Sequence, residues 1–238
     1  MIAWAVTDTG MARRENQDCF RLEKLNTQIT CVVCDGMGGA RSGEVASTVA
    51  VETFMESMQV RPHMKNAETA LSAAVTAANA RVYGKAQTDP AYYGMGTTLV
   101  GAFVARGTAA LVNVGDSRAY KIGAGGIEQI TRDHSLVENL IERGELTREQ
   151  AKEHPSKNLI TRVVGTDEAV IADLFSVELD GGDFLLLCTD GLTNVVDDQE
   201  ILFEVMHGGA PADCCERLVK MANKRGGPDN ITIILIHI

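Results

Sequence analysis

The segment from Cys31 to Glu44, CVVCDGMGGARSGE, constrains the fold of this chain most strongly. An apolar run ends at Asp35, and three of the next four residues are glycine. A short apolar run of this kind is typical of a buried strand. Glycine allows the backbone to turn tightly or to approach another group closely. The sequence therefore predicts a strand that ends at Asp35, followed by a loop that folds around a ligand.

Strand and helix patterns alternate along the rest of the chain, without repeats or a linker rich in Pro or Ser. Apolar runs predict strands at residues 2–8, 28–34, 97–105, 109–114, 117–122, 173–179, 183–189 and 231–238. Apolar positions repeated every three or four residues predict helices at about 42–58, from 67, from 197 and from 211. Residues 133–165 are more charged and predict a small helical insertion. These patterns predict one α/β (α+β) domain over residues 1–238, with two sheets covered by helices.

The composition excludes several classes of function. The net charge of −10 argues against nucleic-acid binding, for which a basic surface is expected. The N-terminus lacks the basic segment of a signal peptide, and the longest uncharged stretch, residues 90–105, is shorter than a membrane span of ~20 apolar residues. Cys31 and Cys34 form a C-x-x-C pair without a second pair at zinc spacing, which favours core packing. We therefore expect a soluble, cytoplasmic, monomeric protein.

Four acidic residues, Asp35, Asp116, Asp190 and Asp229, lie at the ends of predicted strands or next to them. Carboxylates that meet at one edge of a sheet are suitable ligands for Mg²⁺ or Mn²⁺, which prefer oxygen. Each signal is weak alone, because Asp-Gly pairs such as those at Asp35 and Asp190 are common in turns. The glycine-rich loop could instead hold a phosphate, although it lacks the Lys and Ser/Thr of a P-loop.

Eight short motifs strengthen this interpretation because they occur together and in one order. They are GMARRENQD (10–18), DGMGG (35–39), GMGTTL (94–99), NVGDSRAY (113–120), TRDHS (131–135), HPSKNLITRVVG (154–165), CTDGL (188–192) and GPDNIT (227–232). Together they resemble the metal-dependent protein serine/threonine phosphatases of the 2C type (PPM family), in particular the compact bacterial catalytic domains. The resemblance covers essentially the whole chain. It implies a four-layer α-β-β-α sandwich of two mainly antiparallel sheets flanked by helices, with residues 133–165 as a flap beside the site.

The resemblance also implies a centre of two Mn²⁺ or Mg²⁺ ions and a role for each matching residue. Asp35 matches the acid that bridges both ions, and the carbonyl of Gly36 matches a ligand of one of them. Asp190 and Asp229 match ligands of the other ion. Asp18 matches an acid that is reached largely through metal-bound water.

Three further positions complete the implied site. Asp116 matches the ligand of a weaker third ion in bacterial members, and Arg13 matches the arginine that binds the substrate phosphate. Ala40 is a departure, because many bacterial relatives carry at this position a histidine that has been proposed as the general acid. Its absence leaves three alternatives: a metal-bound water protonates the leaving oxygen, another residue does so, or turnover of poor leaving groups is slow.

The implied reaction is hydrolysis of phosphoserine and phosphothreonine in proteins. Two neighbouring cations lower the pKa of a shared water enough to supply hydroxide near neutral pH. Arg13 offers two parallel donors to the non-bridging phosphate oxygens. The expected role is to oppose a bacterial serine/threonine kinase. The alternatives are a dedicated phosphatase of one regulator, such as an anti-sigma antagonist, and a non-catalytic phosphoprotein-binding module, which intact Asp35, Asp190 and Asp229 disfavour.

Overall fold

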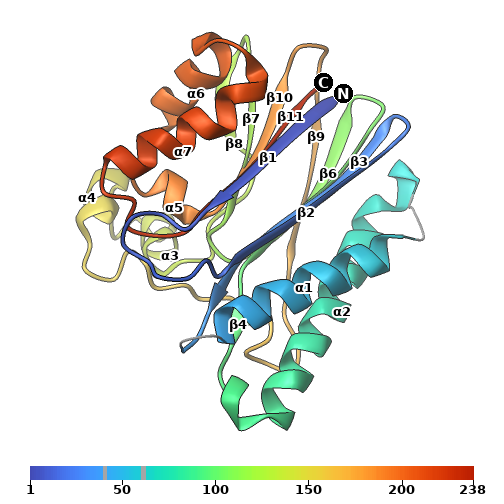
Figure 1. Ribbon diagram of the computed structural model, residues 1–238, viewed down its shortest axis with the longest axis vertical. Coiled ribbons are helices and arrows are strands. Elements are labelled where there is room, and N and C mark those ends of the chain that lie inside the picture. The colour runs from blue at the N-terminus through green and yellow to red at the C-terminus, as the bar shows by residue number, and fades with distance from the viewer. Residues whose placement is uncertain (40–41, 60–62) are drawn as a thin grey trace.

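The computed structural model describes residues 1–39, 42–59 and 63–238. Two β-sheets pack face to face, and helices cover the outer face of each sheet (Figure 1). Every pair of neighbouring strands is antiparallel. The predicted four-layer α-β-β-α sandwich is therefore confirmed.

Each sheet has its own strands and its own helices. The five-stranded sheet has the order β1 (Ile2–Asp8), β11 (Ile231–His237), β10 (Phe184–Cys188), β7 (Arg118–Gly123) and β8 (Gly126–Gln129). Its outer face carries α5 (Asp190–Thr193), α6 (Asp198–His207) and α7 (Cys214–Lys224). The six-stranded sheet has the order β2 (Asp18–Leu25), β3 (Gln28–Met37), β5 (Leu99–Ala105), β6 (Thr108–Val114) and β9 (Asp173–Glu178), with β4 (Gly96–Thr97) paired to β3. Its outer face carries α1 (Ser42–Met58) and α2 (Ala67–Thr88).

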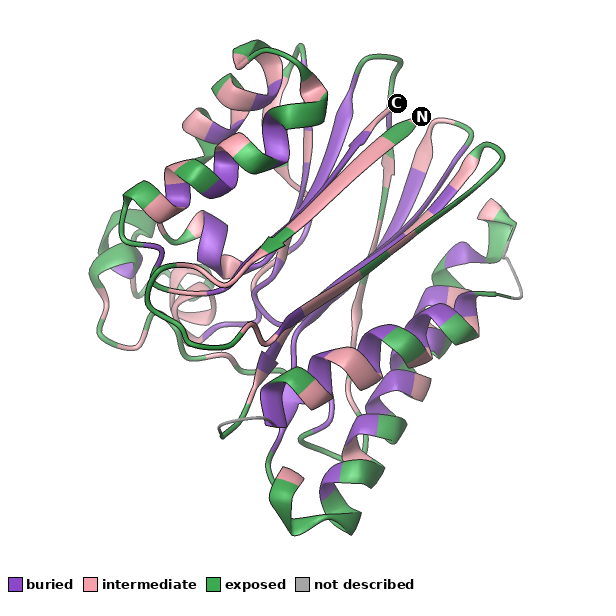
Figure 2. Ribbon diagram, in the orientation of Figure 1, coloured by how far each residue is buried: buried purple, intermediate pink, exposed green. Residues whose placement is uncertain are grey.

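The alternation of side chains along each strand builds two kinds of core. In β3, Val32 and Cys34 pack against α1, whereas Cys31 and Val33 point toward the other sheet. This alternation follows from the two-residue period of a strand. Figure 2 shows the result, with buried residues on the central strands and on the inner sides of the helices. The apolar runs are continuous because both faces of these strands are buried.

One predicted boundary needs correction, and two strands were missed. β3 continues through Asp35 to Met37, so Asp35 lies inside the strand and not at its end. The extension arises because Gly36 pairs with Thr97 of β4. The strands β2 and β8 were not predicted, and in β2 the reason is its exposed charged side chains, such as Glu23, which hide the pattern of a strand.

The flap insertion contains two short helices, α3 (Leu136–Glu142) and α4 (Arg148–Glu153), and otherwise irregular backbone. A capping box begins α4: the side chain of Thr147 accepts from the backbone of Gln150, and that of Gln150 accepts from the backbone of Thr147. Both helices lie beside α5, at one end of the two sheets (Figure 1). The prediction of a small helical segment between 133 and 165 agrees with this structure.

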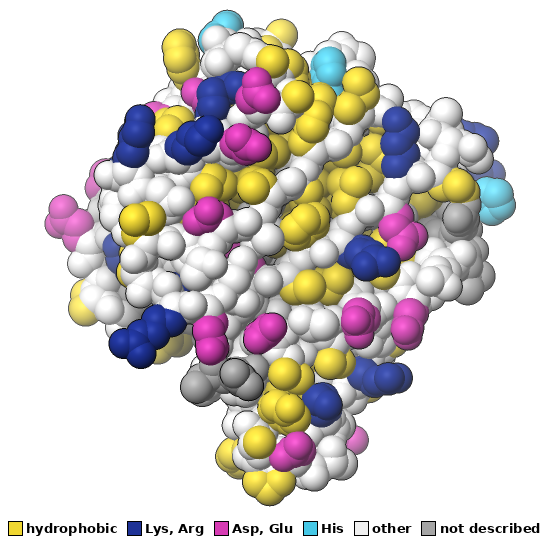
Figure 3. Space-filling model, in the orientation of Figure 1, with side chains coloured by type: hydrophobic (Ala, Val, Ile, Leu, Met, Phe, Trp, Pro, Cys, Tyr) yellow, Lys and Arg dark blue, Asp and Glu magenta, His cyan; other side chains and the backbone are white. Residues whose placement is uncertain are grey.

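The edge strands β1 and β2 lie on the same side of the molecule. Hydrophobic side chains gather in the space between them (Figure 3). Ala5 of β1 and Phe20 and Leu22 of β2 are partly buried against the core between the sheets. None of the helices among the described residues is long and apolar enough to cross a membrane.

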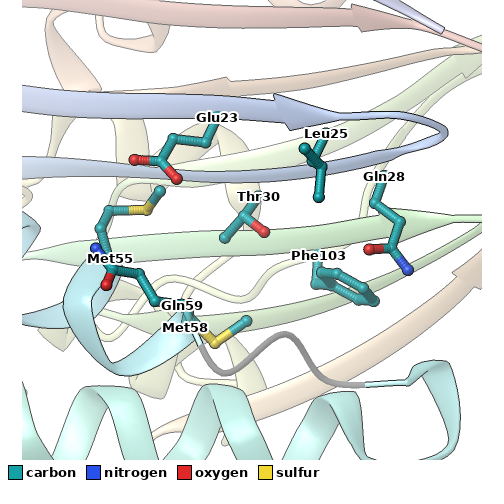
Figure 4. A pocket seen from close by; sticks show the side chains of 8 residues that line it. All are labelled: Glu23, Leu25, Gln28, Thr30, Met55, Met58, Gln59 and Phe103. Atoms are coloured by element: carbon teal, nitrogen blue, oxygen red, sulfur yellow. The ribbon is translucent and has the colours of Figure 1, made fainter.

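A small pocket of about 300 Å³ lies at the Gln28 end of β3, away from Asp35. Met55, Met58 and Phe103 supply its apolar lining, and Glu23 is among its polar residues (Figure 4). The pocket is separate from the acidic residues described next, none of which lines it.

Candidate metal centre

Asp18 and Asp35 lie directly opposite each other on the paired strands β2 and β3. The Asp35 backbone is held by two threonines: its N–H donates to the Thr98 hydroxyl (2.9 Å), and its carbonyl accepts from the Thr97 hydroxyl (2.8 Å). Like charges at opposed positions of a sheet are destabilising. Two strands therefore fix a pair of carboxylates in an arrangement that costs stability.

Asp190 and Asp229 reach the same edge from the other sheet. Asp190 follows β10 as the first residue of α5, and its Oδ2 accepts from Asn194 (2.8 Å). Asp229 precedes β11. A Cβ atom on Gly191 would lie 2.0 Å from the Asn230 carbonyl oxygen, so only glycine fits between the two loops. This close approach brings Asp190 and Asp229 together.

The electrostatics show that the five acids form one cluster. The pKa of Asp35 is raised well above its ordinary value, first by burial and then by the charges of the other four acids: Asp18, Asp190, Asp116 and Asp229. Burial also raises the pKa of Asp18 to about 7, and the pKa of Asp116 to about 8, with the charge of Asp190 adding to both. The pKa of Asp190 is raised by burial and by the charge of Asp229. A cation placed among these groups would remove this cost.

The donor set fits a divalent cation, as the hydrogen bonding shows. One carboxylate oxygen each of Asp18, Asp116 and Asp190 is buried without a hydrogen-bond partner. Buried polar atoms without partners are rare in folded proteins and call for an explanation. Oxygen atoms of carboxylates are the ligands that Mg²⁺ and Mn²⁺ prefer. The unpartnered oxygens are therefore of the type that a cation at this edge requires.

The carboxylates do not yet form a closed coordination sphere. Within the described part of the chain, no group of three or more His, Cys, Asp or Glu side chains is arranged so that it could hold a metal ion. Protein partners explain this openness, since Asp229 Oδ2 accepts from Arg13 (2.8 Å) and Asp18 Oδ2 from two threonines. The five acids nevertheless lie close enough to raise the pKa of Asp35 through their charges.

Arg13 lies at this edge, on the loop between β1 and β2. Its side chain is 52% exposed, and its only ion pair within the described residues is with Asp229. The loop is tied down by N–H donation from Met11 to the Gly227 carbonyl (2.8 Å) and by the close approach of Gly10 to Asp229. An exposed guanidinium on an anchored loop is suited to bind an anion that approaches from solvent.

Two threonines that hold Asp18 could not be identified from the sequence. The hydroxyls of Thr189 and Thr232 donate to Asp18 Oδ2 at 2.9 and 2.7 Å. The side chain of Asn230 donates to the carbonyls of Thr9 and Glu15, and its Oδ1 accepts from the Gln17 backbone (2.8 Å). Asn230 thus joins the Arg13 loop to the Asp229 loop. These contacts cross more than 150 residues of sequence. Thr189 and Asn230 each lie beside an acid, whereas Thr232 does not.

His134 anchors the flap next to Asp116. Its Nδ1 accepts from the Gly115 backbone (3.1 Å), and its Nε2 lies 3.1 Å from Asp173 Oδ2. Arg162 bonds the same carboxylate at 2.7 Å. Burial lowers the pKa of His134, so the neutral ring is favoured. These contacts support a structural role for His134. Ala40, the position at which the sequence departs from the expected motif, and Arg41 lie outside the described residues.

The geometry defines a class of protein: two sheets between helices, with buried carboxylates from both sheets meeting at one edge. The family model for protein phosphatase 2C matches residues 12–230. The serine/threonine phosphatase Stp of Listeria welshimeri is 37% identical, with 97% of this chain and 93% of that protein covered. The protein phosphatase PhpP of Streptococcus pneumoniae is also 37% identical, with 97% and 95% covered.

Solved structures agree with these sequence matches. The serine/threonine phosphatase Stp1 of Staphylococcus aureus superposes with a TM-score of 0.94 at 40% identity, over 99% of this chain and 94% of that one. The catalytic domain of PstP, solved with two manganese ions, gives a TM-score of 0.85 at 32% identity, over 98% and 96%. The chain therefore belongs to the protein phosphatase 2C family and is a serine/threonine phosphatase of that type.

Proposed function

We propose that the acidic edge holds two Mn²⁺ or Mg²⁺ ions, with Asp35 as the bridging ligand. Asp190, Asp229 and the carbonyl of Gly36 supply the remaining protein ligands. The observation that carries this proposal is the set of buried carboxylate oxygens without partners in the cluster around Asp35. The two manganese ions of the PstP catalytic domain support the number and the kind of ion.

Asp18 and Asp116 take outer roles in this proposal. Asp18 Oδ2 is already occupied by two threonine hydroxyls, and its free Oδ1 accepts a hydrogen bond from water at the centre. Asp116 lies on the connection between β6 and β7, with its Oδ1 unpartnered, and it binds a weaker third ion. Asp18 thus orients water at the centre, and Asp116 extends the metal site toward the flap.

Arg13 binds the phosphate of the substrate. Its guanidinium offers two donors to two non-bridging oxygens, and so orients the phosphorus and offsets negative charge in the transition state. The move from Asp229 to the phosphate leaves the core undisturbed, because Arg13 is half exposed. When bound, ions of this kind supply a water of lowered pKa near neutral pH.

The wider assignment follows from the family. The substrates are phosphorylated proteins, and we propose that the enzyme opposes a serine/threonine kinase by removing phosphate from the kinase and its targets. We further propose that residues 1–238 act as one catalytic domain, as a monomer in the cytoplasm. The coverage of more than nine tenths of Stp and PhpP by this chain supports the single domain.

The test measures ion binding and activity on the same preparation. Isothermal titration should show two Mn²⁺ ions bound tightly and a third more weakly. Turnover of a phosphothreonine peptide and of p-nitrophenyl phosphate should disappear in excess EDTA and return when Mn²⁺ is added. Full turnover in excess EDTA, or a protein that binds no Mn²⁺, would overturn the proposal.

A further inference from the structure

A groove of about 720 Å³ is continuous with the acidic edge. Asp116 and Asp190 belong to its wall, so a polypeptide whose phosphate lies at the candidate metal centre has its neighbouring residues at the mouth of this groove. One wall consists of α3, α4 and the segment that follows them in the flap. The other wall consists of α5 and the first turn of α6.

The flap wall carries three basic side chains, Arg148, Lys152 and Lys157, which differ in their ion pairing. Arg148 is paired with Glu138 (3.3 Å). Lys152 and Lys157 are exposed, and neither has an ion pair with any residue that the structure describes. Glu149 is the other acid on this wall, beside Lys152 on α4. Lys157 is therefore the least compensated cation of the wall.

The opposite wall, formed by α5 and the first turn of α6, carries a net negative charge. Asp197 accepts from the Glu200 backbone at the start of α6, and Glu200 is bonded to Arg225 (2.6 Å). Asp198 is exposed and has no ion-pair partner in the described ranges. This wall has three acids (Asp197, Asp198 and Glu200) and one arginine (Arg225), so its net charge is negative. The flap wall has three basic residues and two acids, so its net charge is positive. A groove with walls of opposite charge can orient a charged chain.

We propose that this groove selects phosphoproteins by the charges that flank the phosphorylated residue. Lys152 and Lys157 favour an acidic residue on the flap side, and Asp198 favours a basic residue on the α6 side. A substrate in the reverse orientation places like charges together, and this repulsion contributes to selectivity. The inference rests on the proposed function, since the phosphate must lie at the acidic edge.

The experiment uses the full chain loaded with Mn²⁺ and a set of phosphothreonine peptides. Each peptide carries Glu, Ala or Lys at one of three positions on either side of phosphothreonine. We expect at least one position at which Glu gives a kcat/KM about three- to tenfold above Lys, mainly through KM, as expected for one or two exposed ion pairs. The preference should shrink from low salt to 0.3 M salt, because exposed charges are screened.

Charge reversal assigns the preference to the groove. The double variant Lys152→Glu with Lys157→Glu should reverse the ratio of the Glu to the Lys peptide. Asp198→Lys should change the preference at a position on the other side of phosphothreonine. Lys65→Glu is the matched control, because Lys65 is an exposed lysine in the short helix Met64–Asn66, next to α2, and does not line the groove. This control should keep the wild-type ratio.

Two outcomes would overturn the inference. One is a wild-type enzyme that hydrolyses all peptides of the set alike. The other is a Lys152→Glu, Lys157→Glu double variant that keeps the wild-type ratio of kcat/KM between the Glu and the Lys peptide. The same holds if the control Lys65→Glu changes this ratio as much as the double variant does. Failure of the proposed function is distinguishable, because it would abolish Mn²⁺-dependent turnover of p-nitrophenyl phosphate as well, whatever the peptide charges.

Discussion

The core between the two sheets and the acidic edge are built by the same strands, yet their side chains have opposite effects on stability. β10 contributes Leu185 and Leu187 to the core between the sheets, and the chain reaches Asp190 three residues after Leu187. β3 contributes Val33 in the same way, and Asp35 follows two residues later. The core buries apolar groups and stabilises the fold. The edge buries carboxylates that repel one another, and it costs stability until a cation binds.

This contrast teaches that stability and activity are separable within one strand. In β3, Val33 stabilises the fold by packing in the core, whereas Asp35, two residues later, places a charge at the acidic edge. Substitutions at the core should therefore affect folding with little effect on ion binding, and substitutions at the edge should do the reverse.

The largest effect is expected for Asp190→Asn. Turnover should fall on the order of 10³-fold, because a proposed metal ligand is lost. Loss of a residue that only supports a ligand costs less, roughly 10–100-fold. The free energy of unfolding without metal should stay the same or rise, since one repelling charge is removed. Steady-state kinetics with Mn²⁺ and chemical denaturation in EDTA measure the two effects. The exposed residue Asp213 offers a control, Asp213→Asn, which should change neither; wild-type-like turnover in Asp190→Asn would exclude Asp190 as a ligand.

The core should behave in the opposite way when Leu187 is changed to alanine. Leu187 is fully buried, so Leu187→Ala should lower the free energy of unfolding by about 2–5 kcal/mol. The fraction of Leu187→Ala that is folded should bind Mn²⁺ with the wild-type stoichiometry. Leu174→Ala makes the same change at a residue that is 39% exposed, and it should cost less than about 1 kcal/mol. Loss of Mn²⁺ binding in folded Leu187→Ala would show that core and edge are coupled.

The pH dependence of the metal-free protein tests the edge alone. Burial raises the pKa of Asp18 from 3.8 to about 7 and that of Asp116 from 3.8 to about 8. Between pH 4 and pH 8 the folded state therefore holds more protons than the unfolded state, and the free energy of unfolding should fall as pH rises through this range.

Two comparisons assign this decline to the acids. Saturating Mn²⁺ should flatten it, because a bound cation favours the ionised carboxylates. Asp18→Asn should reduce the slope without metal. His134 has the opposite effect, since its lowered pKa makes stability fall toward acid pH. A metal-free protein that becomes more stable from pH 5 to pH 8 would contradict the raised carboxyl pKa values.

The sequence predicted those parts of the molecule that depend on local patterns. The strand at residues 231–238 could be recognised because Ile233 and Ile234 are buried on opposite faces, which gives a continuous apolar run. The acids were found because each lies in a short motif. The strand β2 was missed, since Arg21 and Glu23 on its outer face are exposed and resemble a loop. The bonds from Thr189 and Thr232 to Asp18 span 171 and 214 residues, and no local pattern encodes them.

The smallest effect at the acidic edge is expected for Asp116→Ala. Asp116 lies on the groove side of the cluster, where it lines the wall shared with the flap, and its Oδ1 has no partner. Loss of a weakly held third ion should lower turnover by about tenfold, within the range of an outer-shell residue, while the two core ions remain. Titration with Mn²⁺ should lose only the weakest binding event, and the matched variant Asp213→Ala should keep all of them. If Asp116→Ala instead loses a tightly bound ion, Asp116 belongs to the core centre, and the distinction between inner and outer acids at this edge is wrong.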